Sequence, residues 1–383
     1  MEARVSKHPR FVGLDIGSSG MRGAELSYDA KLARYTVTRA ASIELPPYSI
    51  ESGEVKNAEA VVRGLKQLWR KGRFGTRKVA FALADPSIIM RMADLPWMPT
   101  DDLKQALRYQ VSEVLPVDIS TVELDYVPLS EYTASDQHGQ PLEMVRMLLV
   151  AANRRYLSEI SELLIKARLE PIAADTAAFA LIRAACGGIV QATPGYHALV
   201  DVGASMVSVI VHVGGSPAFV RSLPNAGTDV VVAALMEQLH IDEASAKRVM
   251  IETGLNGPPP LITPIAESSV FGAIAARETA SIDPTTKAAM SVINPWATSL
   301  VSSVRDSLDY FHSTIAGDER VTAIQLAGRA SSLNGLAERM NTELRIPVGF
   351  VSPFDVTDQA KRVRGANDRE LAVAIGLAMV QST

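Results

Sequence analysis

The stretch that decides the fold reads Val12-Gly13-Leu14-Asp15-Ile16-Gly17-Ser18-Ser19-Gly20-Met21-Arg22-Gly23-Ala24-Glu25-Leu26. Its pattern predicts an apolar strand that ends in Asp15, a tight turn with two hydroxyl residues, and a second strand that leaves from Met21. A glycine turn brings backbone N–H groups close together, and the concavity they form suits phosphate oxygens. A carboxylate at the mouth of this turn could hold a metal-bound water. A Gly-Ser turn between strands is more often just a hairpin, so its meaning depends on the rest of the chain.

The same pattern returns about half a chain later. Residues 198–205 read Ala-Leu-Val-Asp-Val-Gly-Ala-Ser, which is again a strand, an aspartate and a turn of small residues, and a returning strand is predicted over 206–213. A recurrence at half the chain length predicts two similar lobes. Each lobe would offer one phosphate-binding hairpin to a shared cleft.

A third loop, residues 327–335, follows a short apolar strand at 322–326. The two hairpins can grip phosphates from either side, and this loop can lie against adenine and ribose. Phosphate chemistry mainly requires positioning and neutralisation of charge, so Asp15 and Asp201 are predicted to hold a hydrated Mg²⁺. The chain contains no GxxxxGK[ST] motif, and nothing in it indicates a P-loop mechanism.

Composition and charge exclude several classes of protein. At 383 residues the chain exceeds the size of one hydrophobic core, so two or more lobes are predicted. The net charge of -4, without a long basic block, argues against a nucleic-acid partner. A single cysteine, Cys186, fits a reducing cytoplasm, and no apolar run approaches the ~20 residues of a membrane span. A cytoplasmic chain without direct membrane insertion is predicted.

The region between the hairpins contains a segment with its own pattern. Residues 86–165 are predicted to form a small α+β unit with strands over 88–92, 122–129 and 143–151 and a polar loop over 131–139. Beyond the second hairpin, helices are predicted over 229–239, 242–252 and 296–315, whereas 261–295 stays unassigned.

With these motifs, the chain resembles the actin-like ATPase superfamily, and within it the PilM family of type IV pilus assembly proteins, relatives of FtsA. Residues 13–26 resemble the first phosphate motif, 199–211 the second, and 172–181 (Ile-Ala-Ala-Asp-Thr-Ala-Ala-Phe-Ala-Leu) the first connecting motif. The run 90–99 (Met-Arg-Met-Ala-Asp-Leu-Pro-Trp-Met-Pro) resembles the subdomain that PilM proteins insert. The resemblance covers nearly the whole chain.

It implies an α/β, two-lobed actin-like ATPase fold with a small α+β subdomain inserted in the first lobe. Subdomain 1A would comprise 1–85, 166–194 and 370–383, and the inserted subdomain 1C would comprise 86–165. Subdomain 2A would comprise 195–228 and 320–369, and subdomain 2B would comprise 229–319.

The resemblance also implies ATP and Mg²⁺ as ligands. The catalytic positions would be Asp15, Asp175 and Asp201, of which Asp15 and Asp201 would hold the metal through water. Asp175 could instead be a helix N-cap, and Lys247 and Arg329 could be solvated surface cations. The predicted nucleotide contacts come from both hairpins, the third loop and one helix: Gly17, Ser18, Ser19, Gly20, Met21, Gly203, Ala204, Ser205, Lys247, Gly328, Arg329 and Ser331.

Two departures from the family pattern concern nucleotide binding and hydrolysis. The third loop keeps only Gly328 where the family usually carries consecutive glycines, and the side chains of Arg329 and Ala330 follow it. The second hairpin has Met206 and Val207 where a hydroxyl residue is common. Nucleotide binding is therefore predicted, whereas hydrolysis is left open between none and a weak ATPase activity.

The implied function is that of a cytoplasmic scaffold, peripheral to the inner membrane through its protein partners. It would bind the N-terminal peptide of a PilN-like inner-membrane protein, couple it to the pilus motor ATPases, and self-associate. The peptide groove would use residues that could equally be core: Leu95, Trp97, Met98, Leu107 and Val111.

Two other functions stay open. A sugar-kinase-like phosphotransferase would share both phosphate hairpins but would need a sugar pocket with a catalytic base. An FtsA-like division protein would typically end in a linker and an amphipathic membrane helix, whereas this sequence stops at 380–383 straight after an apolar helix.

Overall fold

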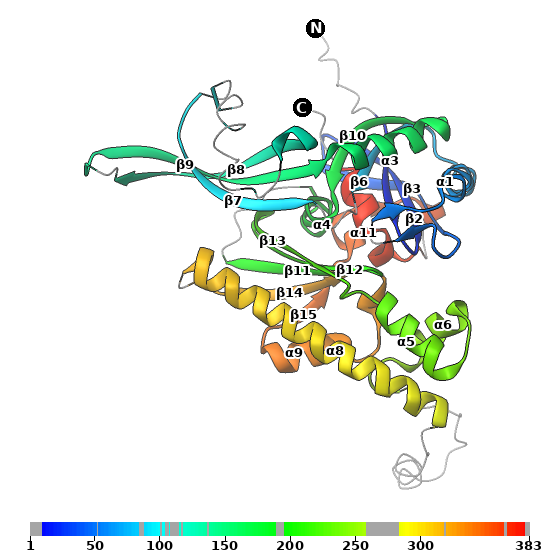
Figure 1. The fold of residues 1–383 in the computed structure, drawn as a ribbon. Helices are drawn as coiled ribbons and strands as arrows, with labels where there is room; N and C mark the ends of the chain where they lie inside the picture. The colour runs from blue at the N-terminus through cyan, green and yellow to red at the C-terminus, as the bar shows by residue number, and fades with distance from the viewer. Residues whose placement is uncertain are drawn as a thin grey trace.

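The computed structural model shows two lobes with a smaller sheet that extends from the first lobe (Figure 1). It describes residues 10–51, 53–83, 88–99, 102–103, 107, 115, 118–135, 138–188, 195–257, 283–317, 319–363 and 366–379. Among the helices in these ranges, none is long and apolar enough to cross a bilayer.

The first lobe is built on a six-stranded sheet in the order β10-β6-β1-β2-β3-β16. The central strand β1 pairs antiparallel with β2 and parallel with β6. The strands are β1 (Val12–Gly17), β2 (Gly20–Asp29), β3 (Arg34–Glu44), β6 (Lys78–Leu83), β10 (Glu170–Thr176) and β16 (Asp358–Gln359). A separate two-stranded ribbon joins β4 (Ile50–Glu51) and β5 (Glu54–Val55).

The second lobe repeats this topology in five strands, in the order β13-β12-β11-β14-β15. Here β11 pairs antiparallel with β12 and parallel with β14, as β1 does with its neighbours. The strands are β11 (Tyr196–Val202), β12 (Met206–Val213), β13 (Ser216–Pro224), β14 (Val321–Ala327) and β15 (Val348–Phe350). The two-lobed α/β fold predicted from the recurring hairpin is confirmed.

Two helices lie between the lobes, α4 (Ala177–Cys186) and α11 (Asp368–Leu377). Their backbones touch, because a Cβ added at Gly376 would lie 1.8 Å from the carbonyl oxygen of Ala180. In the same way, a Cβ at Gly13 of β1 would lie 2.1 Å from the carbonyl oxygen of Ala374. Glycine is the one residue that permits such an approach, so α11 packs tightly on α4 and on β1. The two helices share a buried core with Leu199, Ile210 and Ala327 of the second sheet.

The remaining helices cover the outer faces of the two sheets. On the first lobe, α1 (Ala58–Gly72) and α3 (Arg154–Lys166) bury an apolar core with β1 and β6. On the second lobe the cover consists of α5 (Asp229–Leu239), α6 (Glu243–Thr253), α8 (Pro284–Phe311) and α9 (Leu336–Leu344). The shorter elements are α10 (Pro353–Val356), the 3₁₀ turns at Ile119–Thr121, Arg329–Ser332 and Lys361–Val363, and the π-helical turn at His312–Ala316.

The inserted sheet has the order β7-β9-β8, all antiparallel, with β7 (Ile89–Pro96), β8 (Val122–Ser135) and β9 (Pro141–Asn153). The prediction of a polar loop from residue 131 was wrong, because β8 continues to Ser135 in an exposed hairpin whose polar side chains face solvent. Part of the segment left unassigned is helix, since α8 begins at Pro284, and 258–282 lie outside the described residues. The predicted subdomain boundaries stay a prediction.

Candidate functional site

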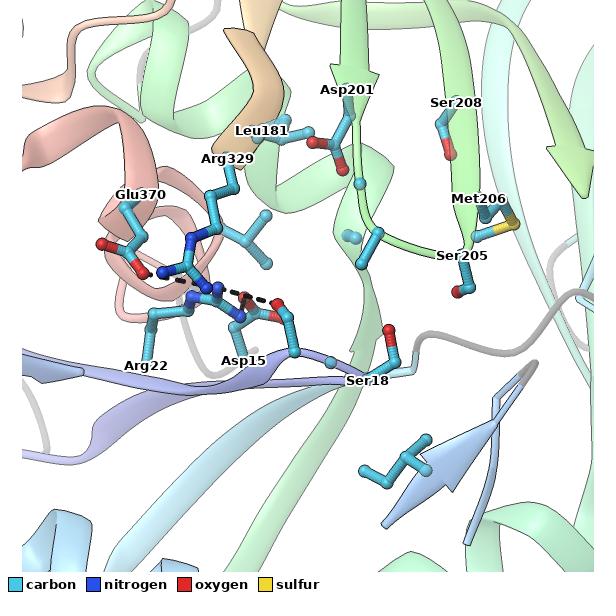
Figure 2. A pocket seen from close by; sticks show the side chains of 18 of the residues that line it. Asp15, Ser18, Arg22, Leu181, Asp201, Ser205, Met206, Ser208, Arg329 and Glu370 are labelled. Atoms are coloured by element: carbon cyan, nitrogen blue, oxygen red, sulfur yellow. Dashed lines mark hydrogen bonds and ion pairs between the residues drawn. The ribbon is translucent and has the colours of Figure 1, made fainter. Parts of the chain in front are cut away.

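Three turns meet in one pocket between the lobes. They are the turn between β1 and β2, the turn between β11 and β12, and the loop after β14, so each lies at the end of a strand that runs toward the cleft (Figure 2). Ten of the predicted site residues line this pocket: Asp15, Gly17, Ser18, Ser19, Asp201, Gly203, Ala204, Ser205, Gly328 and Arg329.

The backbone geometry of the third loop requires glycine at position 328. It has a φ of +80°, and a Cβ there would lie 2.5 Å from Oδ1 of Asp201 and 2.6 Å from the carbonyl oxygen of Val202. The loop therefore packs directly on the end of β11. The hydroxyl of Ser331 donates a hydrogen bond to the carbonyl of Gly328 at 2.7 Å, so Ser331 is a buried support of this loop and does not line the pocket.

The two aspartates face the cleft as a carboxylate pair. Burial raises the pKa of Asp15 above its ordinary value, against the opposing effect of Arg22. Burial, together with the neighbouring Asp15, raises the pKa of Asp201 to about 7. Two buried carboxylates that resist ionisation are stabilised by a cation placed near them.

A hydrated Mg²⁺ fits this carboxylate pair. Within the described residues no group of three or more histidine, cysteine, aspartate or glutamate side chains converges on a metal position. Mg²⁺ commonly keeps several waters and uses one or two carboxylates together with phosphate oxygens. Asp15 and Asp201 supply that number of carboxylates, and the adjoining turns offer room for phosphates.

Arg22 is a cleft residue that the sequence analysis missed. Its side chain is 8% exposed, and its guanidinium lies 3.7 Å from the carboxylate of Asp15 and 3.4 Å from that of Glu370 (Figure 2). It also donates hydrogen bonds to the carbonyl of Gly20 at 3.1 Å and to the hydroxyl of Ser19 at 3.3 Å. A buried cation bound to the phosphate turn is well placed to meet phosphate oxygens.

The register of the two hairpins contained the signal for Arg22. Residue 22 lies directly opposite Asp15 in the β1–β2 pair, so the two side chains share one face of the sheet. In the second hairpin Ser208 occupies the equivalent place opposite Asp201 and also lines the pocket. Ser208 thus supplies a hydroxyl on the strand whose Met206 and Val207 lack one.

A second hollow continues the cleft toward α5 and α6. It shares residues with the first pocket, among them Ser19 and Arg329, and adds the apolar Met250 and Leu333. Lys247 lies here, paired with Glu243 one helical turn away at 2.5 Å. This mixed polar and apolar lining suits a base and a ribose.

Arg329 connects the two lobes across the mouth of the cleft. Its guanidinium lies 2.9 Å from the carboxylate of Glu44 at the end of β3, and this hydrogen bond is the main reason that the pKa of Glu44 is lowered. The side chains are 40% and 76% exposed, so the pair is accessible to solvent.

Besides Ser331, three predicted residues line neither of these hollows. Asp175 accepts a hydrogen bond from the backbone N–H of Thr176 and forms an ion pair with Arg183, which in turn donates to the carbonyl of Gly376 at 2.9 Å. The N-cap of α4 is Thr176, so the alternative that Asp175 caps this helix was wrong. Gly20 shapes the first turn with a φ of +151°, and Met21 is fully buried in the core.

The residues predicted for a partner groove divide into two groups. Leu95 and Leu107 are 6% and 3% exposed and form part of the core of the inserted sheet. Trp97 is 52% exposed and donates a hydrogen bond to Glu131, and Met98 packs against the core from its edge. Val111 lies outside the described residues.

A separate hollow lies along β8 in the inserted sheet. Its apolar lining includes Leu107, Leu124 and Tyr126, and its charged lining consists of Glu123, Asp125 and Arg154. Arg154 donates a hydrogen bond to Glu123 at 3.0 Å.

Comparisons with known proteins agree with this architecture. A family model described as type IV pilus assembly protein PilM matches residues 13–270 and 275–382. Among solved structures, the chain is similar to a PilM-PilN type IV pilus biogenesis complex, with a TM-score of 0.77 and 23% identity over 97% of this chain and 98% of that chain. A search of the curated proteins found no match.

Two further solved structures share the fold at lower similarity. They are the ethanolamine utilization protein EutJ from Carboxydothermus hydrogenoformans, at 13% identity over 97% of this chain and 89% of that chain, and MreB 5 of Spiroplasma citri bound to AMPPNP, at 11% over 96% and 94%. Both have a TM-score of 0.52. The fold is therefore actin-like.

Proposed function

Because the chain belongs to the PilM family of type IV pilus assembly proteins, we propose that it is a cytoplasmic, ATP-binding scaffold of pilus assembly, held at the inner membrane by a PilN-like partner. The observation that carries the nucleotide part is the placement of Asp15, Asp201 and Gly328 around one pocket, each from a separate turn. The family favours this function over the sugar-kinase-like and FtsA-like alternatives.

The cleft residues have distinct roles in this proposal. The N–H groups of the two hairpin turns bind the phosphates, and Asp15 and Asp201 hold a hydrated Mg²⁺. Arg22 exchanges part of its interaction with Asp15 and Glu370 for phosphate oxygens. The hollow beside Lys247 and Met250 receives the base and ribose.

The position of Asp175 supports slow hydrolysis as part of this proposal. Its carboxylate is engaged by Arg183 and is not part of the pocket lining, so it cannot orient a water at the phosphates in this arrangement. We therefore propose a scaffold that binds ATP tightly and hydrolyses it slowly. The motor ATPases and further copies of the chain are proposed as its other partners.

The inserted sheet is the proposed site for the PilN-like peptide. Support comes from the solved PilM-PilN complex, which aligns with nearly all of this chain. The hollow along β8 offers apolar contacts at Leu124 and Tyr126, and its charged rim can select the polar positions of a short peptide.

Two binding measurements test this function. Calorimetry should show ATP binding that requires Mg²⁺, and a synthetic N-terminal peptide of a PilN-like protein should bind the purified chain. Tyr126→Ala should weaken peptide binding while leaving ATP binding unchanged. Tyr132→Ala, farther along β8 and outside the hollow, is the matched control. A chain that binds neither ligand would contradict the proposal.

A further inference from the structure

The edge of the first sheet opposite the cleft is strongly basic. The parallel strands β1, β6 and β10 all run toward the cleft, so their amino ends share the far edge. The helices α1 and α3 pack together and end beside it (Figure 1). Five exposed cations gather there, and we call them the basic edge: Lys66, Arg70, Arg73, Arg77 and Arg168.

A hollow opens within the basic edge. Four of the five cations line it, all except Arg73, and none of the described acidic residues does. Trp69 and Phe74 also line it, packed edge to face at 5.1 Å, and the indole N–H of Trp69 is held by the carbonyl of Thr76 at 2.9 Å. The hollow therefore has a fixed aromatic part and a cationic rim.

Ion pairing within the described residues does not account for these cations, although Arg77 donates a hydrogen bond to the backbone carbonyl of Arg168 at 3.0 Å. Over the part of the chain that the structure describes, none of the five lies within 4.0 Å of a carboxylate, although neighbouring Lys78 and Lys166 pair with Glu170 and Glu162. Cations in the last turn of a helix do favour its dipole, which explains Arg70 of α1. The helix dipole does not explain Lys66, and for Arg77 the structural reason is its contact with the backbone of Arg168.

Two of the arginines have a left-handed backbone conformation at a helix end. Arg73 is the C-cap of α1 with a φ of 48°, and Arg168 follows α3 with a φ of 64°. Glycine is the usual residue at such left-handed positions, and another side chain there costs about 1 kcal/mol. Arg345 at the end of α9 has the same conformation, so the geometry does not by itself mark a binding site, but it makes glycine a substitution that both helix ends tolerate.

We propose that the basic edge binds the anionic phospholipid headgroups of a membrane surface. Its cations are spread over two helix ends and two strand entries, which suits many headgroups at once better than one small anion. The net charge of the chain is -4, yet fields beyond about 8 Å are screened at physiological salt, so the local patch decides the contact. The choice of a membrane as the anionic surface rests on the proposed function, which places the chain beside the inner membrane.

Vesicle co-sedimentation of the purified full-length chain tests the proposal without any partner peptide. The chain should bind phosphatidylcholine vesicles that contain phosphatidylglycerol, should not bind pure phosphatidylcholine vesicles, and should be released by salt. Arg73→Gly and Arg168→Gly should each weaken binding about fivefold, and the double variant about thirtyfold. Neither substitution should lower thermal stability, because each places glycine at a left-handed position.

Arg345→Gly is the matched control. Arg345 is the exposed C-cap of α9 in the second lobe, with a φ of 57°, so the same substitution is made in the same backbone conformation away from the basic edge. It should leave vesicle binding unchanged. An equal loss in this control, or no binding of the unaltered chain to anionic vesicles at low salt, would overturn the proposal.

Two further probes separate other sources of negative charge. Saturable binding of inorganic phosphate or of a polyglutamate peptide, without binding to vesicles, would also overturn the membrane assignment. ATP binding measured on the same preparations distinguishes this failure from failure of the proposed function, because the cleft lies at the opposite end of the strands.

Discussion

Substitution of Asp201 by asparagine should make the ligand-free protein more stable while it weakens binding of the Mg²⁺–nucleotide complex. The folded protein raises the pKa of Asp201 from 3.8 to about 7. A carboxyl with a raised folded-state pKa binds its proton more tightly in the folded state than in the unfolded state. The protonated carboxyl therefore contributes its full stabilisation of the folded protein below about pH 4. That contribution is lost as the pH rises toward 7.

The size of the effect follows from the shift. Each pKa unit corresponds to about 1.4 kcal/mol, so ionising Asp201 costs the folded state on the order of 4 kcal/mol at pH 8. Asparagine keeps the shape and cannot ionise, so Asp201→Asn should gain up to about that amount at pH 8 and less than half of it at pH 5. Water entering the cleft makes this figure an upper bound.

Urea unfolding at the two pH values measures the gain in stability. Calorimetry with Mg²⁺ and ATP measures the loss of affinity, which is expected to be at least about tenfold because the variant lacks one of the two carboxylates proposed to hold the metal. Asp355→Asn removes the same charge from an exposed position and is the control. The reasoning fails if Asp201→Asn is no more stable than the unaltered chain at pH 8, or if its gain is the same at pH 5.

Three further substitutions test other parts of the cleft. Gly328→Ala should abolish nucleotide binding and cost about 1–3 kcal/mol in urea unfolding, because its Cβ would lie 2.5 Å from Oδ1 of Asp201; unchanged binding would contradict this. Glu44→Gln should speed nucleotide release by about two- to fivefold in stopped-flow, since it breaks an exposed ion pair with Arg329 across the mouth. Arg22→Gln should weaken ATP binding at least about tenfold in calorimetry, with Arg22→Lys intermediate; equal affinities would show that Arg22 is structural.

The cleft could be predicted because its signals are local. A strand, an aspartate and a turn of small residues occupy about ten positions, and both hairpins fold as their patterns indicate. Arg22 was missed because its importance comes from cross-strand register, which places it opposite Asp15. The orientation of Asp175 was also beyond the sequence pattern, since it depends on Arg183, two helical turns away on α4.

Other features that the sequence does not predict also depend on contacts between distant segments. β15 is three residues long and exists because it pairs with β14, a contact that no local pattern announces. The basic edge could not be predicted from the sequence for the same reason. Its cations come from α1, the loop before β6 and the loop before β10, and they look like scattered surface charges until the parallel strands bring them to one edge.

The packing between the lobes suggests how nucleotide and partner binding are coupled. On the interior side, α4 and α11 share a buried core with Leu199 and Ile210 of the second sheet, whereas at the mouth an exposed ion pair connects the lobes. Motion should therefore open the mouth about these two helices. The inserted strands β7 and β8 contact β13 of the second lobe, so the same motion displaces the inserted sheet relative to that strand.

A coupling of this kind must be reciprocal. If the peptide prefers one lobe arrangement, saturating peptide should change ATP affinity by the same factor by which saturating ATP changes peptide affinity, typically about five- to a hundredfold. Titrating each ligand in the presence of the other measures both factors. Met90 of β7 packs in the core cluster that includes Val220 of β13, so Met90→Ala should reduce both factors together while each ligand still binds alone. Two independent affinities would show that the inserted sheet moves with the first lobe and does not sense the cleft.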